Sequence, residues 1–335
     1  MDATTITCQF APVFPYRPEL KRKKPQVPQG PRGFPPKEDG WIVEFESFDS
    51  SDRKAQIFGH LFRPEKVKPE LAHRALVILH GQGEHSGRYI HWPHYLKDDV
   101  GSMYLIDHRG HGHSTGIRGH VEDFDFYADD AAAAVRRYYN YLMAKYGKAE
   151  IHLVGHSMGG LIAMRAALRY NLPIESLILS APMVELGFPV GRAKEFAAGI
   201  LNKIVPYLPL PSEPLGDLIS RDPAVVEHYK KDPLNHGLAS PGFYFSYLTA
   251  KKDTLRRAKE FRVPVLVLLP MADQVINPEG TEELYRALGA PEKKIIRYPG
   301  LYHEIFNEPE KDRAFGDLKA WLKTHHAKGE TSAEA

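Results

Sequence analysis

Cysteine is almost missing from this chain of 335 residues, because Cys8 is its only cysteine. An internal disulfide is therefore excluded, and the chain has no need of an oxidising compartment. A long apolar run is missing too: VPVLVLLPMA, from Val263, is about half of the ~20 residues that span a bilayer. The start also lacks the basic-then-apolar order of a signal peptide. We expect a cytoplasmic protein, with peripheral contact to a membrane left open.

Charge of one sign is not in excess either. Lysine and arginine together number 44 against 42 aspartates and glutamates, which leaves a formal net charge of +2. Such a balance gives no reason to expect a nucleic-acid partner. The basic cluster at residues 21–24 lies in a proline-rich extension, residues 1–40. It either belongs to a solvated segment or attracts anionic lipid or a partner. We expect the tail, residues 327–335, to be frayed.

Strand-like and helix-like segments alternate from Trp41 onward. WIVEFESF and AQIFGHLF, separated by DSSDRK, predict an antiparallel hairpin. Helical segments, including 128–147 and LIAMRAALRY, are interspersed with short apolar runs: RALVILH, MYLID, IHLVG, SLILS, VPVLVLL and KIIRYP. This alternation predicts an α/β fold, with a mostly parallel central sheet flanked by helices on both faces. The core is expected to comprise residues 41–182 and 253–326.

Residues 183–252 interrupt this alternation with helical segments and proline-rich loops, and they contain no convincing strand. They predict a helical cap inserted over one end of the sheet. Five apolar residues of this cap recur at helical spacing: Phe196, Ile200, Leu201, Ile204 and Val205. We expect this stripe to pack onto the domain below it, and the alternative is that part of it lines the entrance for an acyl chain.

Two glycines flank a serine in GHSMGG, residues 155–160, where a predicted strand runs into a predicted helix. A nucleophilic serine at the tip of such a sharp turn is held clear of the backbone. Bulky residues two positions away would collide, so Gly155 and Gly159 fit there. The first N–H groups of the helix also lack internal partners and can face developing negative charge. The stretch predicts Ser157 as a nucleophile, and the alternative is a tight turn with an inert serine.

A nucleophilic serine needs a base, and the base needs a carboxylate that orients it. In a parallel α/β sheet, reactive groups gather where the strands end. His303 follows the predicted strand KIIRYP, and Asp273 follows VPVLVLLP, so we predict a triad of Ser157, Asp273 and His303. Glu185 is the reserve acid because it also follows a strand. Glu304 is a poorer choice, because the residue next to His303 should point elsewhere.

The stretch HGQGEHSGRY follows the predicted strand ALVIL and predicts an oxyanion hole. Gly81 and Gly83 let the backbone pass close to the serine and present the N–H of Gln82. The second donor would be the N–H of Met158, directly after the nucleophile. The alternative is that the glycines form only a turn.

The stretch DHRGHGHS contains His108, His111 and His113. A His-x-His pair can bind zinc, but no cysteine lies nearby and a third ligand is not evident. A loop punctuated by glycine suits a tight structural turn beside the site. We therefore expect no metal and no organic cofactor.

Taken together, HGQGEHSGRY, DHRGHGHS, GHSMGG, ADQVINP and YHEIFNE resemble the monoacylglycerol lipase and lysophospholipase branch of the α/β-hydrolase family, over about residues 41–325. The resemblance implies the α/β-hydrolase fold with a helical cap, and the triad and oxyanion donors named above. It also implies substrate contacts at the polar, leaving-group end of the site by Glu84, Arg88 and Tyr229. One departure is Pro270-Met271, where the family usually has a glycine shortly before the acid, so the local loop should differ in shape.

The expected activity is hydrolysis of a small lipid monoester, a monoacylglycerol or a lysophospholipid, through an acyl-enzyme. The alternatives are a small-ester carboxylesterase, a thioesterase or an aminopeptidase. An aminopeptidase would need cap carboxylates to receive a free amino group, and Glu213, Asp217 and Asp222 are candidates. A dehalogenase or epoxide hydrolase is disfavoured, because its nucleophile would be an aspartate at position 157. The non-enzymatic alternative is a catalytically silent ligand-binding protein of the same fold.

Overall fold

The computed structural model describes residues 41–325 of the chain. The proline-rich extension with its basic cluster at 21–24, and the tail at 327–335, lie outside the described residues.

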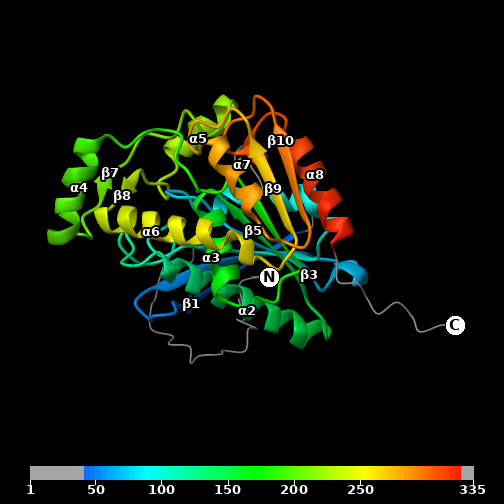
Figure 1. Ribbon diagram of the computed structural model, residues 1–335. Coiled ribbons are helices and arrows are strands. Elements are labelled where there is room, and N and C mark those ends of the chain that lie inside the picture. Colours follow the sequence, from blue (N-terminus) through cyan, green and yellow to red (C-terminus); the bar gives the residue numbers. More distant parts are fainter. Residues whose placement is uncertain (1–40, 326–335) are drawn as a thin grey trace.

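The centre of the molecule is an eight-stranded sheet (Figure 1), whose spatial order is β1-β2-β4-β3-β5-β6-β9-β10. The first two strands form the expected antiparallel hairpin, and β2 also pairs antiparallel with β4, whereas all the remaining pairs are parallel. The expectation of a mostly parallel sheet is confirmed. The strands are β1 (Trp41–Asp49), β2 (Gln56–Pro64), β3 (Arg74–Leu79), β4 (Ser102–Asp107), β5 (Glu150–His156), β6 (Ser176–Ser180), β9 (Val265–Pro270) and β10 (Lys293–Tyr298).

Helices cover both faces of this sheet (Figure 1). One face packs against α2 (Asp125–Tyr146), α3 (Met158–Arg169), α6 (Pro241–Arg257) and α7 (Pro278–Ala287), and the other packs against α1 (Trp92–Leu96) and α8 (Lys311–Thr324). Single turns of 3₁₀ helix occur at Pro69–Leu71, Ser86–Tyr89, Ala258–Glu260 and Ile305–Asn307. The sheet is therefore the middle of three layers.

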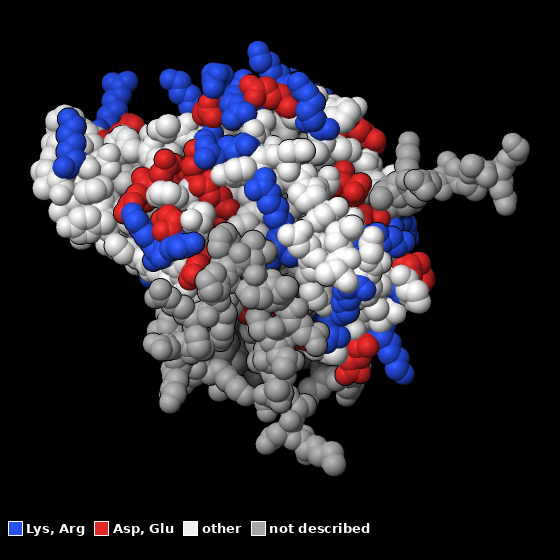
Figure 2. Space-filling view, turned by 90° about the horizontal axis from the view of Figure 1, so that it is seen from below, with Lys and Arg blue, Asp and Glu red and all other residues white. Residues whose placement is uncertain are grey.

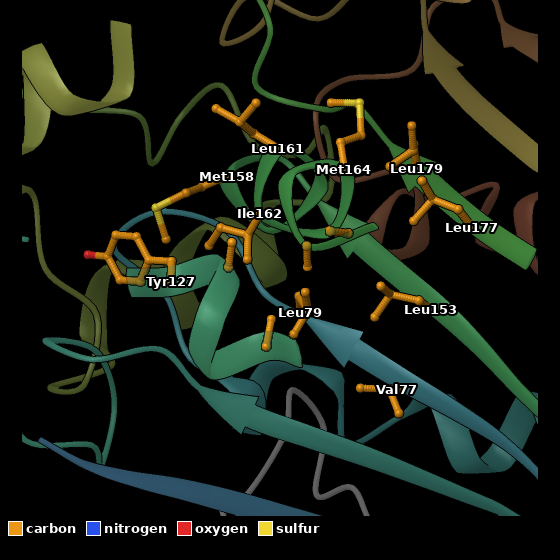
Figure 3. Packing of buried hydrophobic residues seen from close by; sticks show 14 of the residues in the cluster. Val77, Leu79, Tyr127, Leu153, Met158, Leu161, Ile162, Met164, Leu177 and Leu179 are labelled. Atoms are coloured by element: carbon orange, nitrogen blue, oxygen red, sulfur yellow. The ribbon is translucent and has the colours of Figure 1, made fainter. Parts of the chain in front are cut away.

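The central strands are apolar along nearly their whole length because they feed two hydrophobic cores. In β3, Val77 and Leu79 belong to the core on the α2 and α3 side, whereas Leu76 and Ile78 belong to the core on the α1 and α8 side. Successive side chains of a strand point to opposite faces, so a sheet covered on both faces needs apolar residues at every position. Figure 3 shows the first core, in which Leu161 and Ile162 of α3 lie over the strands. The end of β5 is thereby fixed from both sides.

The cap lies beyond one end of the sheet, at the left of Figure 1. It contains α4 (Arg192–Ile204), α5 (Pro223–Lys231) and the first part of α6. It also contains two short strands, β7 (Leu210–Pro211) and β8 (Leu238–Ala239), which pair antiparallel. The expectation of a cap without strands was thus wrong, because strands of two residues are too short to give an alternating pattern. The expected boundary at residue 252 falls inside α6, which continues to Arg257.

The apolar stripe of α4 does not pack onto the domain below it. Phe196 is 72% exposed, Ile204 is 69% exposed and Ile200 is 47% exposed, and α4 contains no buried residue. The packing expectation was therefore wrong for these three residues, because α4 projects past the sheet and packs mainly on α6. Leu201 instead lines a cavity. Val205 is half-buried.

Candidate active site

Ser157 occupies the turn between β5 and α3 and has backbone angles that a serine rarely adopts. Its φ is 51° and its ψ is −118°. Positive φ is costly for a residue with a Cβ, so neighbouring contacts must hold the turn. The Ser157 N–H donates to the carbonyl of Ser180 at 3.0 Å, and its carbonyl accepts from the N–H of Met183 at 2.9 Å. The serine is therefore held at the tip of a sharp, strained turn.

The two flanking glycines are required by close backbone contacts. A Cβ on Gly155 would lie 2.4 Å from the carbonyl oxygen of Gly159, and a Cβ on Gly159 would lie 2.1 Å from that of Leu79. Both distances are too short for carbon against oxygen, and backbone atoms cannot rotate away as a side chain can. Glycine at these positions lets α3 begin directly against β3 and β5.

His303 and Asp273 come together from two different loops. The Nδ1 atom of His303 lies 2.7 Å from Oδ2 of Asp273. The other carboxylate oxygen, Oδ1, accepts from the N–H groups of Val275 at 2.8 Å and Ile276 at 3.0 Å. Because the carboxylate is fixed in this way, it favours the tautomer with the proton on Nδ1, and Nε2 is left to accept a proton.

The environment of His303 raises its basicity. Burial disfavours the charged imidazolium, but the charge and the hydrogen bond of Asp273 outweigh burial, so the pKa of His303 is raised from its ordinary value of 6.5. Such a group takes up a proton more readily than a free histidine does. It suits a general base that must also hold the proton during the reaction.

Ser157 and His303 line the same cavity, which has a volume of about 310 Å³. Their neighbourhood is compact, because the rings of His303 and His156, the residue before the serine, have centroids 4.7 Å apart. Asp273 lies behind His303, away from the cavity. The structure thus brings the three predicted triad residues to one place. The reserve acid Glu185 instead lies against Gly280 at the start of α7.

The predicted oxyanion donors come from the loop after β3 and from the residue that follows the serine. An ideal Cβ on Gly81 would lie 3.2 Å from Cβ of Ser157, so the loop after β3 passes directly beside the nucleophile. Within residues 41–325, no hydrogen bond uses the backbone N–H of Gln82 or of Met158. The Gln82 side chain donates to the carbonyl of Leu238 in β8 at 3.0 Å, which fixes this loop against the cap. Neither N–H group is thus used within the described part of the fold.

A buried cluster of charges forms the polar end of the cavity. Nη1 of Arg88 lies 2.6 Å from Oε2 of Glu84, and Nη2 donates to Oε2 of Glu304 at 2.7 Å. The guanidinium also lies over the ring of Tyr229, 4.8 Å from its centre. Glu84, Tyr229 and Glu304 line the cavity, whereas Arg88 lies behind them. Arg88 is thus better placed to hold the two carboxylates than to touch a substrate, which differs from the expectation.

The carboxylate of Glu84 is ionised in this cluster. Burial alone would raise its pKa, but the charge of Arg88 and the N–H of Gly81, which donates at 2.6 Å, lower the pKa to about 2. The hydroxyl of Tyr89 donates to the same carboxylate at 2.9 Å. Glu84 is therefore a fixed anionic acceptor at the polar end.

Two residues of this site were missed by sequence reasoning. Glu304 was considered only as a rival to Asp273, and its side chain does turn away from His303, toward Arg88. The sequence signal was its charge in a loop that had to be buried beside a catalytic histidine. His156 was treated only as the residue between Gly155 and Ser157, although its side chain lines the cavity.

The histidine-rich loop after β4 is tied together by hydrogen bonds. The N–H of His108 donates to Nε2 of His80 at 3.0 Å, and Nε2 of His111 lies 3.2 Å from the side-chain oxygen of Gln82. Asp107 accepts from the N–H of His113 at 2.7 Å. Among the described residues, no group of three or more histidine, cysteine, aspartate or glutamate side chains could hold a metal ion. The loop supports the segment that carries Gln82.

Comparison with known proteins places this geometry in a family. Residues 71–310 match the model of the family described as serine aminopeptidase, S33. The chain is 32% identical over 263 residues to the monoacylglycerol lipase of Mycolicibacterium smegmatis, which covers 77% of this chain and 91% of that protein. It is 30% identical to phospholipase YtpA of Bacillus subtilis, over 73% of this chain and 93% of the relative.

Solved structures agree with these relatives. The crystal structure of a monoacylglycerol lipase from Paleococcus ferrophilus has a TM-score of 0.66 and 28% identity, and the match covers 85% of this chain and 99% of that one. The fold, the strained serine turn and the sequence matches point the same way. The chain belongs to the serine aminopeptidase S33 family of α/β-hydrolases.

Proposed function

We propose that this protein hydrolyses the carboxylic ester of a lipid monoester, a monoacylglycerol or a lysophospholipid, through an acyl-enzyme on Ser157. The observation that carries the proposal is one cavity on which the strained Ser157 and the His303–Asp273 pair both converge. A monoacylglycerol lipase and a phospholipase among the relatives support the same class of substrate.

The proposed mechanism has two similar steps. Nε2 of His303 removes the hydroxyl proton of Ser157, whose oxygen attacks the acyl carbonyl carbon. The N–H groups of Gln82 and Met158 stabilise the oxyanion, and the imidazolium then gives its proton to the departing alcohol. Water, deprotonated by the same histidine, attacks the acyl-enzyme and releases the fatty acid. Asp273 stabilises the charged imidazole through its hydrogen bond to Nδ1.

The two ends of the cavity match the two ends of a lipid monoester. Its walls are mainly apolar on the cap side, with Met183, Leu186, Phe188, Val190, Leu201 and Leu215 among the lining residues. An acyl chain buried there leaves water at roughly 0.8 kcal/mol per CH₂ group. Glu84, Glu304 and Tyr229 form the polar end, where a hydroxylated alcohol can find hydrogen-bond partners.

The described cap does not favour an aminopeptidase. A free amino group would need a set of cap carboxylates that converges on the cavity. Glu213 lines the cavity, where it is partly exposed and pairs with Lys194, whereas Asp217 pairs with Lys230 on the surface. Asp222 accepts from the N–H of Ala224 and caps α5. Of the three cap carboxylates, only Glu213 thus reaches the cavity, and it is already paired with a lysine.

We also propose that the cap docks peripherally on a membrane through α4. Its three exposed apolar side chains, Phe196, Ile200 and Ile204, continue into exposed Tyr207 and Leu208. In Figure 2 the projecting left end of the molecule, where Figure 1 shows α4, is mostly uncharged, whereas positive and negative side chains mix over much of the rest. An amphipathic helix of this kind lies in the interface of a bilayer. No helix within residues 41–325 combines the length and apolar content needed to cross a membrane.

A lipid-hydrolysis panel tests the proposed function. The purified protein is assayed with monoacylglycerols of increasing chain length, with lysophospholipids and with an aminoacyl-naphthylamide. We expect turnover of the lipid esters and none of the amide, and no turnover at all by Ser157→Ala. The exposed Ser51→Ala serves as the control and should match the wild type. Lipid-ester turnover retained by Ser157→Ala, or amide turnover exceeding that of the esters, would overturn the proposal.

A further inference from the structure

A second groove, separate from the active-site cavity, lies at the junction between the cap and the core. It has a volume of about 670 Å³ and shares no lining residue with the active-site cavity. Its walls come from the core loop 117–125, from the end of α4 and the residues after it, and from segment 242–250 of α6. The N–H of Ser240 donates to the carbonyl of Gly119 at 2.8 Å, so the core loop and the start of α6 are joined directly. An occupant of this groove would therefore contact core and cap at once.

Part of the groove wall is apolar and exposed. Ile117 in the core loop is 46% exposed, and Tyr207 beyond α4 is 54% exposed, and both line the groove. Phe245 of α6 lies in the same wall and is half-buried. Exposed apolar side chains gathered in one hollow are typical of a surface that another segment covers.

The rest of the wall is acidic. Three carboxylates face a single guanidinium there, those of Glu122, Asp123 and Asp125 against Arg165. Arg165 donates to Asp125 at 2.7 Å, and Glu122 pairs with Lys54 only at the exposed surface. Within residues 41–325, no cation pairs with Asp123, whose carboxylate accepts the N–H of Asp125 at 2.9 Å. The groove therefore keeps negative charge and favours a cationic occupant.

One segment of this chain has the matching chemistry. Residues 10–24, FAPVFPYRPELKRKK, lie outside the described residues and carry five basic side chains against one glutamate. Four of the five form the basic cluster at residues 21–24, and three aromatic residues precede it: Phe10, Phe14 and Tyr16. Aromatic and basic groups in one segment complement a wall that is apolar in one part and acidic in another.

The chain is long enough to bring this segment to the groove. Gln56, which pairs with Asp49 at the far end of β1 from Trp41, accepts the N–H of Thr115 at 3.0 Å, two residues before the groove loop begins. The segment must therefore reach along β1, whose nine residues span about 30 Å. The 17 residues from position 24 to position 41 can span about 56 Å when extended.

We propose that residues 10–24 bind this groove within their own chain. The basic cluster then lies against Glu122 and Asp123, and the aromatic residues lie against Ile117 and Tyr207. The bound segment ties the cap to the core. The test needs no substrate, so it is independent of the proposed ester hydrolysis.

Photo-cross-linking in the full-length chain tests the proposal. Tyr16→p-benzoylphenylalanine places a photoreactive group inside the segment while keeping an aromatic ring there. After irradiation, mass spectrometry of the peptides identifies the cross-linked partner. We expect cross-links within one chain to the groove walls, at residues 117–125, 202–207 or 242–250.

Two variants test the charge complementarity. Glu122→Gln with Asp123→Asn removes both charges but keeps an oxygen that can accept at position 123. Serine at all four positions 21–24 removes the basic cluster without changing any described residue. Each variant should lower the cross-linked fraction about threefold or more, as the loss of two or more exposed charge pairs does. The control, Asp217→Asn with Glu227→Gln, removes two exposed carboxylates outside the groove and should leave the fraction unchanged.

Circular dichroism identifies the variants that fold, and if the double groove variant does not, the serine variant alone decides. Cross-links between two chains would assign the groove to a second copy and overturn the proposal. Cross-links elsewhere on the chain, or none, would also overturn it. So would an unchanged cross-linked fraction in a folded variant, or an equal loss in the control.

Discussion

The guanidinium of Arg88 binds the carboxylate of Glu304 through both of its terminal nitrogens, across 216 positions of sequence. Both side chains are almost fully buried. The pair joins the loop that carries His303 to the loop that carries Gln82. It therefore links the base to an oxyanion donor through one ion pair, with Glu84 as its third member.

Breaking this buried pair should be costly. We expect Glu304→Gln to lower the free energy of unfolding by about 3 kcal/mol, because Arg88 keeps a buried charge with one carboxylate fewer. Urea denaturation measures the loss. The control is Glu227→Gln, which breaks the exposed pair with Lys231 and should leave the free energy of unfolding nearly unchanged. Equal small losses in the two variants would show that the Arg88 cluster does not tie the loops together.

The pH dependence should follow from the pair of His303 and Asp273. As a general base His303 must be neutral, so kcat/KM should fall as the pH drops through its pKa, which Asp273 holds above 6.5. Asp273→Asn removes the charge that raises the pKa of His303 but keeps the burial that lowers it. We therefore expect the acid limb of the kcat/KM profile to move to lower pH. The rate should also fall about 10⁴-fold, because the imidazole is no longer held in the tautomer that carries its proton on Nδ1.

A pH profile on a p-nitrophenyl ester checks both parts of this prediction. The exposed Asp217→Asn is the control and should leave the midpoint of the acid limb in place. An unmoved midpoint in Asp273→Asn would assign the titration to another group.

The serine turn should not tolerate a methyl group at its first glycine. Gly155→Ala places a Cβ 2.4 Å from a backbone oxygen, so we expect a loss of more than about 2 kcal/mol in the free energy of unfolding and loss of labelling at Ser157. Gly316→Ala in α8 is the control, because a Cβ there would meet no heavy atom within 4 Å outside its own helix backbone. It should stabilise the helix by roughly 0.5–1 kcal/mol. Equal stabilities of the two variants would contradict the steric account.

Docking through α4 should depend on its exposed apolar residues. We expect the triple variant Phe196→Ser, Ile200→Ser and Ile204→Ser to bind phospholipid vesicles at least about tenfold more weakly, since each inserted side chain contributes on the order of 1 kcal/mol or more. Co-sedimentation with neutral and anionic vesicles measures this. Met143→Ser, at an exposed apolar residue of α2, should not change binding. Undiminished binding by the triple variant would place the membrane contact elsewhere.

The sheet and the serine turn were predictable from local sequence. Each of the six apolar runs became a strand, because a buried parallel strand leaves an uninterrupted apolar signature. The pairing of His303 with Asp273 followed from chain order and from their places after strands. Even the departure at Pro270-Met271 has a simple structural account: Met271 and Ala272 donate N–H bonds to Tyr298 and Leu301, so neighbours of β10 hold the loop without a glycine.

The features that were missed depend on distant contacts. Helical periodicity identified the stripe with Phe196, but it does not say whether a face meets protein or solvent, and the direction of α4 decided this. Glu304 and Arg88 could be paired only once the loops were placed together.

The most direct test of the central claim is the site of covalent labelling by a fluorophosphonate, mapped by mass spectrometry of peptides from the intact wild-type protein. The account predicts one adduct, on the hydroxyl of Ser157, that forms more slowly in His303→Ala. An adduct on another residue, or a folded protein that catalyses ester hydrolysis without modification at Ser157, would contradict it.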